Sequence, residues 1–189
     1  MNEQLIQFVR EHTKHFDASH DINHVIAVYQ NAVLIAKEEL PDYDDDILQH
    51  ACLLHDVCDH KYANALPRHE LHKYINQKLC DEKAQVVIDV IDKMSFSQEV
   101  KGLRKKLNTP YQDIVSDADK LEALGEGGLE RCIVFTEEIG GDVPSDVVKH
   151  CHDKLLKLKD FYIRTNTGKA MAEPLHQVIA DYVLITSEQ

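Results

Sequence analysis

Apolar residues recur at helical spacing along nearly the whole chain. Between residues 20 and 39 the apolar positions fall on one side of a helix, at Ile22, Val25, Ile26, Tyr29, Val33 and Ala36. No stretch alternates apolar and polar residues with the period of two that a half-buried strand requires. We therefore predict an all-α fold, a compact bundle of about nine helices, at about residues 2–15, 20–39, 44–57, 69–79, 82–94, 111–124, 128–139, 145–161 and 168–187.

Turn-forming residues separate these helices. Ser19 is the predicted N-cap of the second helix, and Pro41 breaks the chain after it. The polar stretch from Ser95 to Pro110 fits two descriptions, a long loop or a short helix followed by a loop. The segment from Cys58 to Arg68 is a predicted loop, and glycines mark two later breaks, at Gly125, Gly127 and Gly128 and at Gly140 and Gly141.

The length and the absence of linkers favour a single domain. A chain of 189 residues can bury a proper core, and it contains no internal repeat and no low-complexity tract. We expect one domain over residues 1–189, with a motif-bearing core over about 15–125 and C-terminal helices over 128–187 that pack on this core.

Charge and composition restrict the possible partners. A net charge of −12 disfavours attraction to polymeric nucleic acid or to an anionic membrane, but a small phosphorylated substrate remains compatible with it. No apolar run approaches the roughly 18 residues of a membrane span, and the first residues do not resemble a signal peptide. Five cysteines without a Cys-x-x-Cys pair indicate reduced thiols. We expect a cytoplasmic protein, and its oligomeric state stays open.

One dipeptide stands out, the adjacent His55 and Asp56 at the end of an apolar helical run. The positions Ile47, Leu48, Ala51 and Leu54 repeat at helical spacing, so His55 falls on or beside the buried side of this helix. A buried imidazole next to a carboxylate needs partners, and a metal ion can serve both groups. A histidine satisfied within the core beside an aspartate at the helix end is the alternative.

Two other helices carry residues of the same chemistry. His24 lies on the second helix, and Asp117 and Asp119 lie on the helix near residue 117. Together with His55 and Asp56 they supply two imidazoles and two carboxylates, a set that suits one divalent ion such as Mn, Mg, Fe, Co or Ni. Thiol-rich zinc sites have a different composition.

This pattern, H…HD…D, resembles the HD-domain superfamily of metal-dependent phosphohydrolases. Over about residues 15–187 the chain is similar to the small stand-alone bacterial HD hydrolases. The matching segments are Ser19-His20-Asp21 with His24, Leu53-Leu54-His55-Asp56, Asp117 to Gly125, and His150 with Lys154 to Leu158. The chain departs from that group at Glu122, in the turn Gly125-Glu126-Gly127-Gly128, and at Leu175 before His176.

The resemblance implies the HD-domain fold and a metal-dependent phosphohydrolase. The expected substrate is a phosphoester or phosphoanhydride of a nucleotide, with a nucleoside triphosphate cleaved to monophosphate and pyrophosphate as one option. Release of a single phosphate, or hydrolysis of a cyclic nucleotide or an alarmone, stays open. Two rivals are a non-catalytic metal- and nucleotide-binding sensor and a di-iron oxygenase. The intact set of four ligands disfavours the sensor, and the shortage of further suitably placed histidines disfavours the oxygenase.

The resemblance also ranks the two aspartates of the later helix. Other HD enzymes place their last ligand in an Ala-Asp-x-Leu context, which matches Ala118-Asp119-Lys120-Leu121. Residues two apart on a helix point about 200° apart, so Asp117 and Asp119 cannot easily bind one ion together. The predicted metal ligands are therefore His24, His55, Asp56 and Asp119, with Asp117 as the alternate for Asp119.

Further residues near these motifs are candidates for catalysis and substrate binding. In the superfamily an acidic residue at the position of Asp59 often acts on the attacking water, and Lys61 could bind a phosphate oxygen. The candidate substrate-binding residues are His20, His60, His150 and Lys154. Each of these has the alternative of an ordinary solvated side chain. His69 and His72 are expected on a solvated helix face, which favours a single metal ion over two.

Overall fold

The computed structural model describes residues 1–16 and 21–187, and every regular element among them is helical. The predicted all-α fold is therefore confirmed. The elements are α1 (Glu3–Thr13), α2 (Ile22–Glu39), α3 (Asp45–Leu54), α4 (Arg68–Lys78), α5 (Asp81–Asp92), α6 (Phe96–Val100), α7 (Tyr111–Glu122), α8 (Gly125–Glu138), α9 (Ser145–His150), η1 (Cys151–Leu155), η2 (Leu158–Tyr162) and α10 (Asn166–Ser187).

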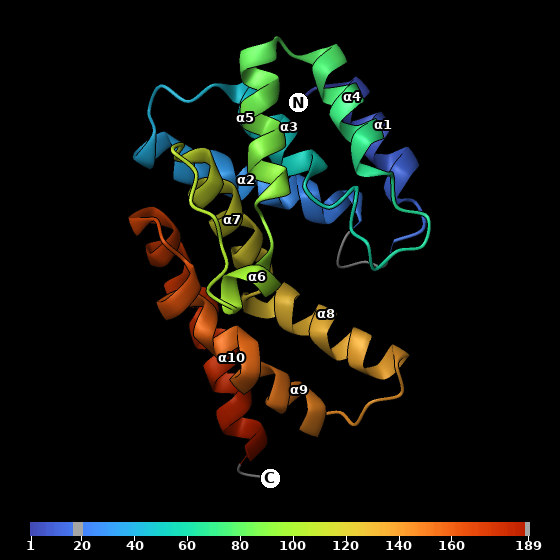
Figure 1. Cartoon of the computed structure of the whole chain (residues 1–189). Coiled ribbons are helices and arrows are strands. Elements are labelled where there is room, and N and C mark those ends of the chain that lie inside the picture. Colours follow the sequence, from blue (N-terminus) through green and yellow to red (C-terminus); the bar gives the residue numbers. More distant parts are fainter. Residues whose placement is uncertain (17–20, 188–189) are drawn as a thin grey trace. The chain divides into compact units, whose positions relative to one another are not determined.

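Contacts divide the chain into two compact units, Met1–Ser116 and Asp117–Gln189, and the division falls inside the continuous helix α7. In the first unit α3 packs against α1, α2 and α5, while α4 packs on α5 (Figure 1). Every residue of α3 from Ile47 to Leu54 is buried. This helix is the centre of the first unit, and it ends directly before His55.

Polar caps fix where the first three helices begin. The side chains of Asn2, Asp21 and Asp44 each accept hydrogen bonds from two backbone N–H groups in the first turn of the helix that follows. The second helix therefore begins at Ile22 with Asp21 as its cap, and not at residue 20 as predicted. The predicted cap Ser19 lies outside the described residues.

The segment between residues 95 and 110 is a short helix, α6, followed by a loop, which is one of the two predicted forms. The buried Gln112 holds this loop, because its amide oxygen accepts the N–H of Leu107 and its amide nitrogen donates to the Lys105 carbonyl at 2.9 Å. Arg104 adds a hydrogen bond of 2.6 Å to Asp113 on α7. The loop is thus anchored to α7.

In the second unit α10 packs against α8, η1 and η2, and α9 packs against α8 (Figure 1). The predicted helix over 145–161 is wrong in detail, because the chain instead forms α9 and the two π-helical segments η1 and η2. Its apolar positions Val147, Cys151, Leu155 and Leu158 are nevertheless buried as the helical spacing requires. Periodicity therefore gave the buried side correctly but not the hydrogen-bond pattern.

Glycines shape the turn between α7 and α8. Gly125 has φ +70°, a left-handed conformation that favours glycine, and α8 already begins there instead of at the predicted residue 128. A Cβ at Gly128 would lie 2.3 Å from the backbone of Ala123, so only glycine allows this close approach. The turn that follows α7 is therefore short and tightly defined.

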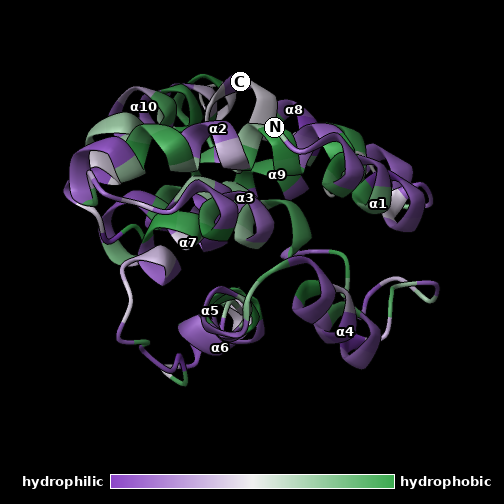
Figure 2. Cartoon of the chain, turned by 90° about the horizontal axis from the view of Figure 1, so that it is seen from above, coloured by the Kyte–Doolittle hydropathy of each residue, from purple (hydrophilic) through white to green (hydrophobic). Residues whose placement is uncertain are grey.

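Apolar and polar residues are interspersed along the helices and do not form long blocks (Figure 2). This is the amphipathic pattern of helices that bury one side. Among the helices that the structure describes, none combines the length and apolar character needed to cross a membrane.

Candidate metal centre

His24 lies in the first turn of α2, and its backbone is fixed by the helix cap. The carboxylate of Asp21 accepts the N–H of Asn23 at 2.9 Å and that of His24 at 3.0 Å. The side chain of His24 is buried, with 7% of its surface exposed. The cap therefore fixes the backbone of His24, and burial limits the space in which its ring can move.

His55 directly follows α3, and its ring orientation is set by a backbone carbonyl. Its Nδ1 lies 2.7 Å from the carbonyl oxygen of Cys52. Because a carbonyl only accepts hydrogen bonds, Nδ1 carries the proton, and in the neutral imidazole Nε2 then carries the lone pair. This is the arrangement that metal-binding histidines commonly have, with one nitrogen held by the protein and the other directed to the ion.

The two imidazoles converge on one carboxylate oxygen. Oδ2 of Asp56 lies 3.1 Å from Nε2 of His55 and 3.5 Å from Nε2 of His24. A neutral Nε2 of His55 that faces a carboxylate brings two lone pairs together, so this contact requires either a proton or a cation between them. Ligand atoms about 2.1 Å from an octahedral ion are about 3 Å apart, so both distances fit a shared ion.

Asp119 completes the group. It lies on α7, the helix that begins in the first unit. His24, His55 and Asp119 each offer one ligand atom, and these three atoms all lie within 4.8 Å of one another. Two imidazole nitrogens with carboxylate oxygens suit a divalent ion of the Mn, Fe or Co type. The residues present therefore fit the predicted metal.

Asp117, the alternate ligand, faces a different environment. Its carboxylate is completely buried and accepts hydrogen bonds from the backbone of Arg164 and from the backbone and hydroxyl of Thr165, at 2.7 to 3.1 Å. Protein donors thus surround both of its oxygens. This environment supports Asp119 over Asp117 as the proposed ligand.

The candidates next to the His-Asp pair lie in the turns after α3. Asp59 is partly exposed, and its Oδ1 accepts the backbone N–H of Lys61 at 3.0 Å. The His60 side chain is fully exposed, and its Nδ1 lies 3.7 Å from the same Asp59 oxygen. The ammonium of Lys61 is placed 4.9 Å from the centre of the Tyr62 ring. The roles predicted for these three residues stay predictions.

The remaining candidates lie in several places. His20 is outside the described residues. His150 is exposed at the end of α9, and Lys154 is half-buried on η1, both in the second unit. His69 is exposed, and His72 lies on α4 with its Nε2 3.2 Å from Asp92.

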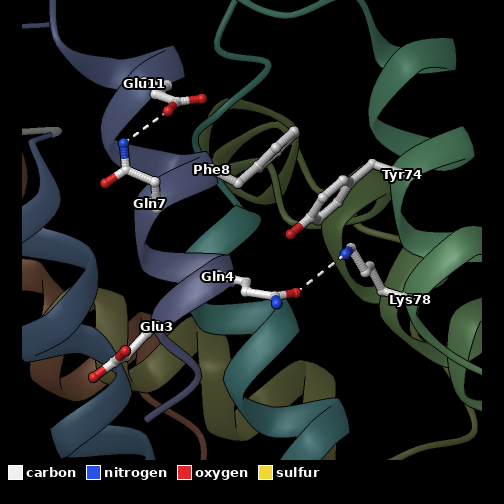
Figure 3. Close-up of a pocket in the computed structure, with 7 residues that line it drawn as sticks. All are labelled: Glu3, Gln4, Gln7, Phe8, Glu11, Tyr74 and Lys78. Atoms are coloured by element: carbon white, nitrogen blue, oxygen red, sulfur yellow. Dashed lines mark hydrogen bonds between the residues drawn. The ribbon is translucent and has the colours of Figure 1, made fainter.

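A shallow groove of about 380 Å³ lies between α1 and α4, and it contains none of the predicted site residues. Figure 3 shows Phe8 and Tyr74 facing one another there, and their stacked rings have centroids 3.6 Å apart. Lys78 donates to Gln4 across the same groove. The groove offers stacking and a few surface charges, whereas the group around Asp56 offers metal-binding chemistry.

Comparisons with known proteins agree with this geometry. The family profile described as HD domain matches residues 21–124, which is more than half of the chain. The chain belongs to the HD-domain family. It is 30% identical over 188 residues to YpgQ of Bacillus subtilis (strain 168), an uncharacterised protein, and the alignment covers 96% of this chain and 89% of YpgQ.

Solved structures share the fold. The crystal structure of Bacillus subtilis YpgQ in complex with ADP matches with a TM-score of 0.80 at 28% identity, over 98% of this chain and 96% of that one. An HD-superfamily hydrolase from Bacillus thuringiensis matches with a TM-score of 0.76 at 26% identity, over 98% of this chain and 94% of that one. The HD-domain fold predicted from the sequence is confirmed.

Sequence reasoning missed the residues that hold the ligands in place. The carbonyl of Cys52 orients the ring of His55, and the cap at Asp21 fixes the backbone of His24, but neither group belongs to the H…HD…D pattern. The Asp21 cap had a visible signal in the sequence, because aspartate is a preferred residue directly before the first residue of a helix. The Cys52 carbonyl had none, since backbone groups leave no trace in a sequence.

Proposed function

We propose that the chain is a metal-dependent phosphohydrolase that cleaves a phosphoester or phosphoanhydride of a nucleotide. The observation that carries this proposal is the convergence of Nε2 of His24 and Nε2 of His55 on Oδ2 of Asp56. Asp119 on α7 lies within reach of the same ion. Membership of the HD-domain family, and the similarity to an HD-superfamily hydrolase, support hydrolysis as the reaction.

The proposed ligands are His24, His55, Asp56 and Asp119. A divalent ion bound by them would lower the pKa of its water toward about 7 and polarise a phosphoryl oxygen. The protein holds His55 in the tautomer that this requires, because its Nδ1–H donates a hydrogen bond to the Cys52 carbonyl and leaves the lone pair on Nε2. One ion is proposed, because His69 is exposed and His72 contacts Asp92 instead.

The remaining proposed roles belong to residues outside the ligand set. Asp59 is the proposed base for the attacking water, which it must reach within hydrogen-bond distance. Lys61 and Lys154 are the proposed contacts for phosphate oxygens, and His20, His60 and His150 the proposed contacts for the rest of the substrate. Local cations of this kind are needed, because the net charge of −12 repels a polyphosphate at long range.

The proposed substrate class is a nucleotide. YpgQ was crystallised with ADP, and it shares the fold with this chain over nearly its whole length. A triphosphate cleaved to monophosphate and pyrophosphate is the favoured reaction, with release of a single phosphate as its alternative.

A panel of nucleotides tests the proposal. The purified protein is supplied with Mn²⁺, Mg²⁺, Co²⁺ or Ni²⁺, and phosphate and pyrophosphate are followed separately. Metal-dependent release of either product, abolished in Asp56→Ala, is the expected result. Nucleotide binding by calorimetry without turnover under any metal would instead identify a sensor. Absence of both metal and nucleotide binding would contradict the proposal.

A further inference from the structure

The carboxylate of Asp117 ties α7 to the segment that leads into α10. The backbone N–H of Arg164 donates to Oδ1 at 3.1 Å and to Oδ2 at 3.0 Å, while Thr165 donates its N–H at 2.7 Å and its hydroxyl at 2.8 Å to Oδ2. Asp117 is completely buried. We call this set of contacts among Asp117, Arg164 and Thr165 the Asp117 latch.

The latch is built into the start of α10 and is not a chance surface contact. The Thr165 hydroxyl donates to Asp117 and also accepts the N–H of Gly168 at 3.0 Å, which is the geometry of a helix N-cap. A Cβ at Gly168 would lie 2.5 Å from this hydroxyl oxygen and 3.2 Å from Oδ2 of Asp117. Glycine at this position therefore keeps the three groups close together.

The latch fixes the rotation of α7 about its own axis. Asp117 and Asp119 point about 200° apart, because they are two residues apart on one helix. When Asp117 is held against Arg164 and Thr165, Asp119 is directed to the opposite side of α7. We propose that Asp117 and Thr165 are positioning residues, which set the direction of the Asp119 carboxylate toward the metal centre without binding the ion themselves. This inference rests on the metal centre of the proposed function.

Small errors in the direction of a ligand weaken metal binding strongly. Ligands must be held within about 0.5 Å and 10–20° of their working geometry, and loss of an outer partner typically lowers metal affinity about 10- to 100-fold. A rotation of α7 by a few tens of degrees would exceed that tolerance. A latch that only stabilised the second unit would instead lower stability and leave the metal affinity of the folded protein unchanged.

The test measures Mn²⁺ affinity by titration calorimetry on the full chain, for wild type and three threonine variants. Thr165→Val removes the hydroxyl but keeps the shape, and Thr165→Ser keeps the hydroxyl. Thr136→Val is the matched control, because Thr136 is a buried threonine whose hydroxyl donates to the Cys132 carbonyl of its own helix at 2.8 Å. Circular dichroism confirms that each variant is folded at the temperature of the titration.

We expect Thr165→Val to lower Mn²⁺ affinity about 10- to 100-fold, while Thr165→Ser and Thr136→Val stay within about twofold of wild type. Wild-type affinity in Thr165→Val, or an equal loss in Thr136→Val, would overturn the latch but leave the proposed function intact. A wild-type protein that binds no Mn²⁺ would refute the metal centre and the latch together.

A second variant tests the latch from the other side. Asp117→Asn keeps the size of the side chain but turns an amide donor toward the donors of Arg164 and Thr165, so it should weaken Mn²⁺ binding in the same range. Because both changes break one latch, the double variant with Thr165→Val should lose less than the product of the two separate losses. Fully multiplicative losses would show that the two residues act independently, against the inference. Where Thr165→Val proves too unstable to titrate, Asp117→Asn alone still tests the latch, and wild-type Mn²⁺ affinity in that folded variant would overturn the inference.

Discussion

Two aspartates, Asp56 after α3 and Asp117 in α7, differ in what surrounds them. Oδ2 of Asp56 is approached by the Nε2 atoms of two histidines. The carboxylate of Asp117 is approached by two backbone N–H groups and a hydroxyl. The first arrangement gathers groups that bind cations. The second supplies the protein's own donors to a buried charge, which stabilises the fold.

Burial alone does not separate a proposed metal ligand from a carboxylate that accepts hydrogen bonds within the fold. Asp117 is more deeply buried than Asp56, which retains 17% of its side-chain surface. Burial raises the pKa of the Asp117 carboxyl, and the hydrogen bonds from Thr165 and Arg164 act in the opposite direction. The chemistry of the neighbouring atoms separates the two roles, since imidazole nitrogens favour a metal and N–H donors favour a structural anion.

The largest expected effect is the loss of Asp56. Asp56→Ala should abolish Mn²⁺ binding in calorimetry, because it removes the oxygen on which both imidazoles converge. Nucleotide hydrolysis should fall by more than about 100-fold, which is the upper end of the loss typical for residues that only contact a metal ligand. Asp42→Ala, a change at an exposed aspartate in the turn before α3, is the control and should behave as wild type. Full metal occupancy in Asp56→Ala would show that Asp56 does not bind the ion.

The next test changes each of the two aspartates of α7 to asparagine in turn. Asp119→Asn should remove most of the Mn²⁺ affinity, because it deletes the charge that completes the proposed ligand set. Asp117→Asn should lower the free energy of unfolding by about 1–3 kcal/mol, because buried donors lose their anionic acceptor. Its Mn²⁺ affinity should fall less than that of Asp119→Asn. Calorimetry and urea unfolding measure the two effects, and the reverse order of affinities would return Asp117 to the role of ligand.

Local pattern in the sequence was enough to predict the buried helix α3 and a group of side chains that lie close together. Helical periodicity placed α3 and its buried side, and the H…HD…D pattern selected His24, His55 and Asp56, which the structure brings together. The HD-domain fold followed from the same pattern. These features are visible because they depend on spacing within one helix or on side-chain types.

Contacts between distant segments could not be predicted in this way. Thr165 is 48 residues from Asp117, and no periodicity links the two. Thr165 did carry a signal as a helix cap three residues before Gly168, but nothing indicated that its hydroxyl also serves Asp117. The π-helical segments η1 and η2 were missed for a related reason, since burial repeats there as it would in an α-helix.

An effect on catalysis alone, without loss of the metal, is expected from the lysines. If Lys61 or Lys154 contacts phosphate, its change to alanine should cost about 2–4 kcal/mol in kcat/KM, by analogy with the loss of an oxyanion donor. Mn²⁺ binding should stay intact, which separates these variants from Asp56→Ala. Lys169→Ala, at an exposed lysine in the first turn of α10, is the matched control. Wild-type steady-state kinetics at fixed ionic strength in both variants would remove the lysines from the site.

The smallest expected effect concerns His50, a buried histidine outside the metal centre. Its side chain lies on α3 with 3% of the residue exposed, and Nδ1 donates to the Asp46 carbonyl at 2.7 Å. Its Nε2 has no hydrogen-bond partner among the residues that the structure describes. Burial lowers the pKa of His50; the Asp46 carbonyl and carboxylate act in the opposite direction, while Lys78 and Lys83 lower it further.

The sign of the resulting pH dependence follows from proton uptake. Because the pKa of His50 is lowered in the folded protein, the unfolded chain binds more protons at this histidine as the pH falls below about 6.5, so stability falls with the pH in that range. One proton limits the slope to about 1.4 kcal/mol per pH unit. In urea unfolding between pH 5 and 8, His50→Leu should therefore flatten the acid side of the stability curve relative to wild type. The exposed His152→Leu is the matched control and should leave the slope as it is. An unchanged slope in His50→Leu would mean that another group carries the acid sensitivity of the fold.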